Sequence, residues 1–370
     1  MVVDLEKGQP MWPDRRLLDL FRIDYPIIQA PMAGPVLHEM VIAVAEAGGL
    51  GSLPTAQLTV DQVRAELATI RQHTRRPINL NFFCHKPAAI DAAREAAWRD
   101  RLAPYYRELG VDPAVPVPAV HRAPFDDAMC RVVEDTRPEV VSFHFGLPEA
   151  ALLARVRATG ATIVSSATSV DEARWLEARG CDAIIAQGLE AGGHRGNFLA
   201  DDPVRDCANQ AGTMALVPQV VDAVKVPVVA AGGIADARGI VAAFALGAAA
   251  VQIGTAYLFC PEARVTPLHR AALRQAKDNG TALTNIFTGR PARSLINRAV
   301  RELGPFHGDA PAFPLAGNAL APLKASAEAR GSADFGALWS GQAARLGREM
   351  PAGELTRTLA TEALAQLSRR

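Results

Sequence analysis

The 370-residue sequence predicts an α/β protein built on one (β/α)8 barrel, the TIM barrel, with a small α/β subdomain inserted near the last βα unit. Eight short apolar runs and the helical segments between most of them support this prediction. Runs that are apolar on both faces and alternate with helices are typical of a parallel sheet covered by helices. Eight such units favour closure into a barrel over the roughly five or six strands of an open sheet.

The predicted strands follow one another along the chain, and each ends in glycine or in small polar residues. They are Pro26–Met32, Gly48–Pro54, Pro77–Phe83, Val140–Phe145, Thr162–Thr168, Ala183–Gly188, Pro227–Gly233 and Ala250–Ala256. The segments between most of them carry apolar residues at helical spacing. We expect the helix after the second strand to begin at an N-cap Thr59. The helix after the fifth strand should begin at Ser169, ahead of Glu172.

Two segments interrupt this alternation. The segment Cys84–Glu139 is too long for one crossover, and it contains a helix-like stretch followed by a proline-rich stretch. The second interruption begins near Pro261 and is rich in proline and glycine. We therefore expect a barrel over residues 16–265, a small inserted subdomain over 266–321, and C-terminal helices over 322–370 that return to the barrel.

Composition narrows the class of protein. The 39 basic and 39 acidic residues are interspersed and give zero formal net charge, which argues against a nucleic acid or an acidic membrane as partner. The N-terminus has no apolar signal region, and no apolar run is long enough to cross a membrane. An odd number of scattered cysteines favours reduced thiols and a cytoplasmic location; they are Cys84, Cys130, Cys181, Cys207 and Cys260.

Glycines at the strand ends predict an anion site, because the active site of such a barrel lies at the C-terminal ends of its strands. The seventh strand ends at Gly232 and Gly233, and the eighth ends in the run Gln252–Thr255. Such ends favour phosphate binding, although glycines can also serve only to make tight turns. The loop after the sixth strand, Gly188–Gly196, is a candidate flexible cap over a ligand, with a plain solvent loop as the alternative. It has neither Walker nor GxGxxG spacing.

His144 is the candidate catalytic residue. Alternation places it on one face of the fourth strand with Ser142, and Phe143 and Phe145 on the other face. If both phenylalanines pack under the helices, the imidazole points into the barrel mouth, where it could take a proton or hold an anion. No histidine has metal-ligand spacing, so no metal is expected. The ordinary surface histidines are expected to be His38, His73, His85, His121, His269 and His307.

Several motifs together resemble one known family. They include PIIQAPMAG, NLNFFCH, VVSFHFGLP, AQGLEAGGHRG, VVAAGGI, ALGAAAVQIGTAYL and FTGRPARSLINR, and they extend from about residue 20 to near the C-terminus. The glycine motifs are shared by many flavin barrels, whereas the combination of VVSFHFG, AGGHRG and FTGRPAR is specific. The chain resembles the bacterial class I nitronate monooxygenases, formerly called 2-nitropropane dioxygenases.

The resemblance implies an enzyme that uses FMN and O2 to convert alkyl nitronates, such as propionate 3-nitronate, into a carbonyl compound and nitrite. It implies that His144 is the catalytic histidine and that Met32 lies beside the flavin ring. It further implies flavin contacts at Asn81, Gln187, Gly192, Gly193, Gly232, Gly233, Gln252, Ile253, Gly254 and Thr255. Phe313 departs from the tyrosine that precedes proline in some relatives, which bears on the polarity of the substrate pocket.

Two alternative functions remain open at this point. The first is an NAD(P)H-dependent quinone or enoyl-thioester reductase of the same flavin barrel superfamily, which would share the barrel and the glycine loops. The second is a flavin-binding barrel without turnover, for which an inward histidine would be unnecessary. The sequence sets no expectation for the oligomeric state.

Overall fold

The computed structural model describes residues 11–115 and 122–369, and its centre is a barrel of eight parallel strands. The strand order is β1-β9-β8-β6-β5-β4-β3-β2, and the barrel closes through a parallel bridge between Ile28 and Leu50. The strands are β1 (Ile27–Gln29), β2 (Gly51–Pro54), β3 (Ile78–Phe83), β4 (Val140–His144), β5 (Thr162–Ala167), β6 (Ala183–Gln187), β8 (Val228–Ala231) and β9 (Ala250–Ile253). The predicted TIM-barrel fold class is confirmed.

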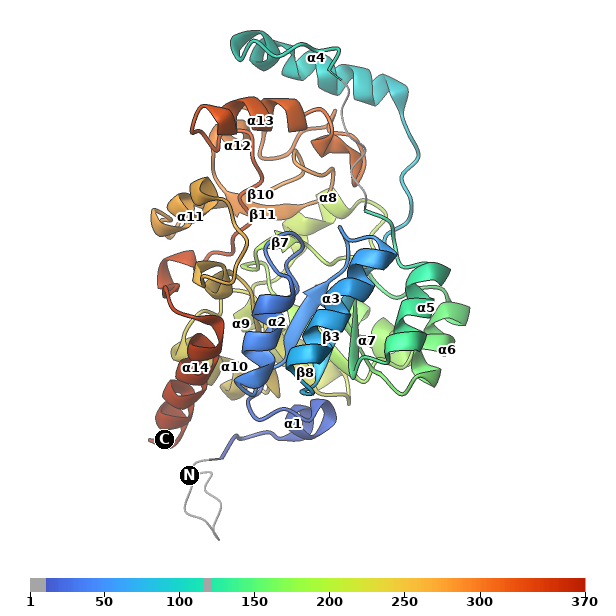
Figure 1. The fold of residues 1–370 in the computed structure, drawn as a ribbon, viewed down its shortest axis with the longest axis vertical. Helices are drawn as coiled ribbons and strands as arrows, with labels where there is room; N and C mark the ends of the chain where they lie inside the picture. Colours follow the sequence, from blue (N-terminus) through green and yellow to red (C-terminus); the bar gives the residue numbers. More distant parts are fainter. Residues whose placement is uncertain (1–10, 116–121, 370) are drawn as a thin grey trace.

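A ring of helices surrounds the barrel, one after each strand, with a short helix before the first strand (Figure 1). They are α1 (Arg16–Phe21), α2 (His38–Glu46), α3 (Val60–His73), α5 (Asp127–Thr136), α6 (Ala150–Ala158), α7 (Val170–Ala178), α9 (Thr213–Ala223), α10 (Ala237–Ala245) and α14 (Ala352–Leu367). Both predicted N-caps are confirmed. Thr59 forms a capping box with Gln62, and the Ser169 hydroxyl accepts a hydrogen bond from the Glu172 nitrogen at 3.2 Å.

The small subdomain combines distant parts of the chain. The strands β10 (Thr281–Thr284) and β11 (Ala292–Leu295) pair antiparallel, and β11 also pairs with β7 (Gly193–His194), which belongs to the loop after β6. The remaining helices are α4 (Ala92–Glu108), α8 (Pro203–Asp206), α11 (Pro267–Arg274), α12 (Arg298–Leu303) and α13 (Ala321–Ala329). This sheet therefore attaches the subdomain directly to a loop at the barrel mouth.

Two helices lie elsewhere than the predicted boundaries place them. Helix α4 leaves the barrel and packs on the subdomain, where the Trp98 indole nitrogen donates to the Ala316 carbonyl at 3.0 Å. Figure 1 shows α4 beyond α13, at the opposite end of the molecule from α1 and α14. Helix α13 buries Leu323 and Ala327 in the same apolar cluster, so only α14 returns to the barrel, where it packs against α2 and α10.

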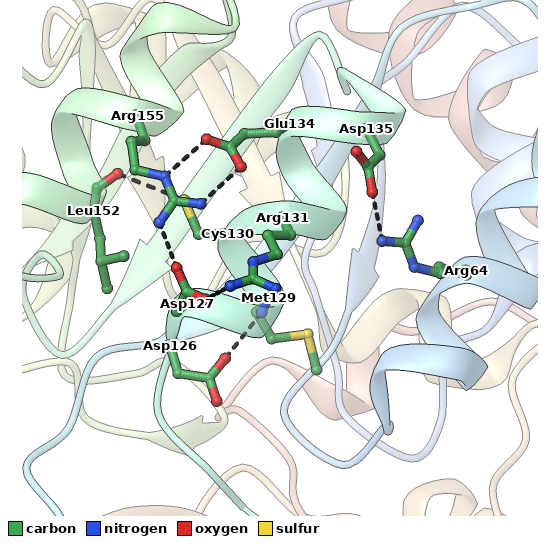
Figure 2. Close-up of polar contacts among 10 residues, drawn as sticks. All are labelled: Arg64, Asp126, Asp127, Met129, Cys130, Arg131, Glu134, Asp135, Leu152 and Arg155. Atoms are coloured by element: carbon green, nitrogen blue, oxygen red, sulfur yellow. Dashed lines mark hydrogen bonds and ion pairs between the residues drawn. The ribbon is translucent and has the colours of Figure 1, made fainter.

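Ion pairs join helices on the outer surface of the barrel (Figure 2). Arg155 of α6 pairs with Asp127 and Glu134 of α5, and Arg64 of α3 pairs with Asp135 of α5. Such exposed pairs contribute little to stability. Within the described ranges, no helix is long and apolar enough to cross a membrane.

Candidate active site

A cavity opens at the C-terminal ends of the barrel strands and contains nearly all of the predicted site residues. Its lining includes Met32, Asn81, His144, Gln187, Gly192, Gly193, Gly232, Gly233, Gln252, Gly254 and Thr255. Ile253 is the exception, because its side chain is fully buried in the apolar core. The reason is strand alternation, which turns Gln252 and Gly254 toward the cavity and Ile253 away from it.

His144 ends β4 and contacts two groups. Its Nδ1 lies 2.6 Å from the Ser166 hydroxyl oxygen, and its Nε2 lies 3.3 Å from the His194 carbonyl oxygen. A carbonyl can only accept, so Nε2 carries the proton and Nδ1 accepts from Ser166. Burial lowers the pKa of His144 to about 3, and the charge of Arg290 acts in the same direction. The imidazole is therefore neutral near pH 7.

The expected alternation at the end of β4 is wrong for Phe145. Phe143 packs in the core, but the chain turns at Phe145, whose φ of 70° ends the extended backbone. The buried Phe145 ring consequently lies 4.9 Å from the ring of Phe83, which lines the cavity, and 5.6 Å from that of Phe313. The guanidinium of Arg290 lies 4.2 Å from its centroid. His144 still faces the cavity because it precedes the turn.

The loop after β6, which the sequence predicts to be a flexible cap, is tied to the barrel by side-chain hydrogen bonds. The Gln187 side chain accepts from the Gly196 nitrogen at 2.8 Å and donates to the His194 carbonyl at 3.0 Å. Arg195 is fully buried and donates to the carbonyls of Gly188 and Gln187 at 2.6 and 2.7 Å. Its Nε donates to Gln210 at 2.7 Å. These contacts hold the loop across the cavity beside His144.

Glycines allow a close approach of backbone segments at the other end of the cavity. Gly232 and Gly233 have φ values of 115° and 70°, which side chains rarely adopt. A Cβ atom at Gly192 would lie 2.5 Å from the Gly341 nitrogen, so only glycine fits there. The Gly341 nitrogen donates to the Thr255 hydroxyl at 2.8 Å. The segment Trp339–Gly341 thus completes the wall beside the predicted phosphate site.

Comparisons with known proteins agree with this geometry. A family model described as nitronate monooxygenase matches residues 14–362. A nitronate monooxygenase of Pseudomonas aeruginosa is 43% identical over 349 residues, which cover 94% of this chain and 98% of that protein. One from Paraburkholderia phytofirmans is also 43% identical, over 351 residues and 94% of each chain.

The chain belongs to the nitronate monooxygenase family. Among solved structures, it is similar to a nitroalkane oxidase from Streptomyces ansochromogenes, with a TM-score of 0.86 and 40% identity over 96% of this chain and 100% of that one. Proteins of the nitronate monooxygenase family are flavin enzymes, so this chain is a flavin-type oxidoreductase.

The cavity of this nitronate monooxygenase family member fits a flavin. The Gln252 side-chain oxygen is buried and has no hydrogen-bond partner among the described residues. Among the described residues, the backbone N–H groups of Gly233 and Gly254 also have no hydrogen-bond acceptor. Unsatisfied groups of this kind are costly unless a ligand pairs with them. Gln252 would hold the ring system, and the glycine amides would hold a phosphate.

Charge in the cavity is one-sided. Among the described lining residues there is no aspartate or glutamate, whereas Arg122 contributes a guanidinium.

Two histidines expected on the surface are instead buried, His85 at 6% exposure and His269 at 7%. Burial lowers the pKa of each to about 4, and His269 lines the cavity. His121 lies outside the described residues. In the described chain, no group of three or more acidic, histidine or cysteine side chains could hold a metal ion.

Sequence reasoning missed Ser166, Arg122 and Trp339. Ser166 was detectable, because Phe143 is opposite Ser165 in the parallel register, which places Ser166 beside His144. Ser165, a strand-end candidate by position, is fully buried and donates to the Gly146 carbonyl at 2.9 Å. Arg122 and Trp339 belong to loops far from β4 in the sequence, and no local pattern marks them.

Proposed function

We propose that this protein uses FMN and O2 to oxidise alkyl nitronates, such as propionate 3-nitronate, to a carbonyl compound and nitrite. The observation that carries the proposal is the cavity itself, which combines His144, a glycine-lined end and positive charge without an acidic lining residue among those described. Two nitronate anions and one O2 contain the atoms and charge of two carbonyl compounds and two nitrite ions. The overall reaction is therefore balanced without another reductant.

Bound FMN would supply the electron transfer and the oxygen chemistry. The residues of this chain bind and orient the substrate. A nitronate is already an anion, so it needs hydrogen-bond donors and positive charge rather than a strong base. Neutral His144 has its single N–H at Nε2, which donates to the His194 carbonyl in this structure and would donate to the nitronate instead when the substrate is bound; Ser166 fixes that tautomer through Nδ1. Arg290 supplies positive charge from behind Phe145.

FMN is favoured over FAD because one glycine-lined end suits one terminal phosphate. The sequence also has no GxGxxG fingerprint for a dinucleotide. The test is to denature the purified protein and identify the released flavin by chromatography. Stoichiometric FMN is expected, and stoichiometric FAD would contradict the proposal.

Oxygen uptake and anaerobic flavin reduction test the reaction. A panel of small nitronates should stimulate oxygen uptake, with nitrite formed alongside the carbonyl compound. Under anaerobic conditions a nitronate should bleach the flavin rapidly. Rapid bleaching by NADH and none by any nitronate would instead identify the reductase alternative.

A further inference from the structure

Arg122 is a half-buried cation that lines the cavity. Its Nε and Nη1 atoms are buried, and neither has a hydrogen-bond partner among the described residues. Phe125, three residues on, anchors the backbone beside Arg122 by donating to the Phe83 carbonyl at 2.7 Å. A buried guanidinium with free donors is unfavourable unless an anion pairs with it. Because Arg122 lines the cavity, an anion bound in the cavity would be the partner of this guanidinium.

Two arginines near the cavity lie at different distances from His144. The Arg290 guanidinium lies 4.2 Å from the centroid of the Phe145 ring, which is 4.4 Å from the His144 ring. The Arg122 guanidinium lies 6.0 Å from the Phe313 ring, which is one ring farther along, 5.6 Å from Phe145. Arg290 is therefore nearer to His144 along this row of rings, and Arg122 is farther out.

A row of aromatic rings lies between His144 and Arg122. The ring of His144 lies 4.4 Å from that of Phe145, which lies 5.6 Å from that of Phe313. The Arg122 guanidinium lies 6.0 Å from the Phe313 ring. Phe83 packs against these rings and lines the cavity, so this side of the cavity is apolar and suits a short carbon chain between two charged groups.

We propose that Arg122 is a specificity-determining residue that binds a carboxylate on the substrate, at the end remote from the nitronate group. This inference rests on the proposed function and assigns a residue to its substrate selection. A guanidinium binds a carboxylate through paired hydrogen bonds in a fixed fork. The buried His85 Nδ1, which has no partner among the described residues, lies in the same region. The protein thus prefers nitronates with a second negative charge.

The test compares two substrates of equal shape in the flavin-loaded enzyme. They are propionate 3-nitronate and the nitronate of 3-nitropropionamide, in which an uncharged amide replaces the carboxylate. Arg122→Met should lower kcat/KM for the carboxylate about 10- to 100-fold more than for the amide, because one charge-assisted hydrogen-bond pair is lost. Arg122→Lys should restore part of the preference. An unchanged preference in Arg122→Met would overturn the proposal.

Two controls separate direct contact from other effects. Arg131→Met removes a mostly exposed arginine of α5 (Figure 2) and should leave the preference unchanged. If Arg131→Met lowered the preference equally, the effect would be general electrostatics and the proposal would be wrong.

Calorimetric binding of succinate, an unreactive dianion, gives a readout without turnover. If no nitronate reacts, the proposed function fails. Weaker succinate binding in Arg122→Met would still support the anion site, and unchanged binding would overturn it.

Discussion

Replacement of His144 by alanine should slow nitronate oxidation without loss of the flavin. The wild-type imidazole is neutral, because burial and Arg290 lower its pKa to about 3. The interaction lost is therefore a neutral donor to an anion, worth about 1.5–3 kcal/mol. That corresponds to a decrease in kcat/KM of roughly 10- to 150-fold. A protonated imidazolium would contribute more than this neutral donor. A much larger decrease in kcat/KM would therefore indicate that His144 takes up a proton from solvent when the anion binds.

The same pKa predicts how the wild-type enzyme treats neutral nitroalkanes. These must first lose a proton, and a base with a pKa of about 3 accepts one poorly at neutral pH. Pre-ionised nitronates should therefore be much better substrates than the parent nitroalkanes. Any residual nitroalkane turnover should fall further in His144→Ala than nitronate turnover does, because the alanine variant has no base at this position.

The assay is oxygen uptake with both substrate forms, measured alongside flavin content. His144→Gln is a matched variant, because its amide can still donate to an anion, and it should retain more nitronate activity than alanine. Near-wild-type kcat/KM in the alanine variant with full flavin would refute the reasoning. His144 would then be a core histidine, and His194 would be the next candidate, although its Nε2 already lies 3.0 Å from the Thr288 hydroxyl.

Three further predictions concern the phosphate end, acid stability and the loop after β6. Gly254 has room for a side chain toward Met32. Gly254→Asp should therefore weaken FMN binding roughly 100-fold by charge repulsion, whereas the isosteric Gly254→Asn should not. Fluorescence titration of the apoprotein with FMN measures both affinities, and equal affinities would place the phosphate elsewhere. Buried His144, His85 and His269 have folded pKa values of about 3, 4 and 4, below the unfolded value, so the unfolded state binds more protons as pH falls below about 6.5. The free energy of unfolding should then be lower at pH 5 than at pH 7 by about 2 kcal/mol per histidine. Urea unfolding should show a smaller pH dependence in His269→Gln, and an unchanged dependence would contradict this account. Arg195→Met should lower the free energy of unfolding by about 3 kcal/mol or more, because two backbone carbonyls and Gln210 lose a buried donor. Unchanged thermal unfolding would show that the loop keeps its place without these hydrogen bonds.

Local patterns in the sequence predicted the barrel and most of its mouth. Short β-branched runs and helical spacing mark strands and helices within a few residues, and the caps at Thr59 and Ser169 follow the same local chemistry. The strand ends of a parallel barrel meet on one face, so glycines and His144 could be placed at one site without knowledge of any contact. Local alternation was wrong at Phe145, where a turn with positive φ ended the strand one residue early.

The sequence by itself determined the order of βα units, the position of His144 and the glycine-lined end, because each depends on neighbours a few residues away. Only the tertiary structure decided that α4 packs on the subdomain, where the Trp98 indole reaches a carbonyl 218 positions along the chain. It also decided that Arg122 and His144 line the same cavity, with Phe313 packed nearby. Such contacts join loops that are held in place by different parts of the fold, so no periodicity in the sequence predicts them. Burial likewise set the charge of His144, because desolvation depends on every element packed around the imidazole.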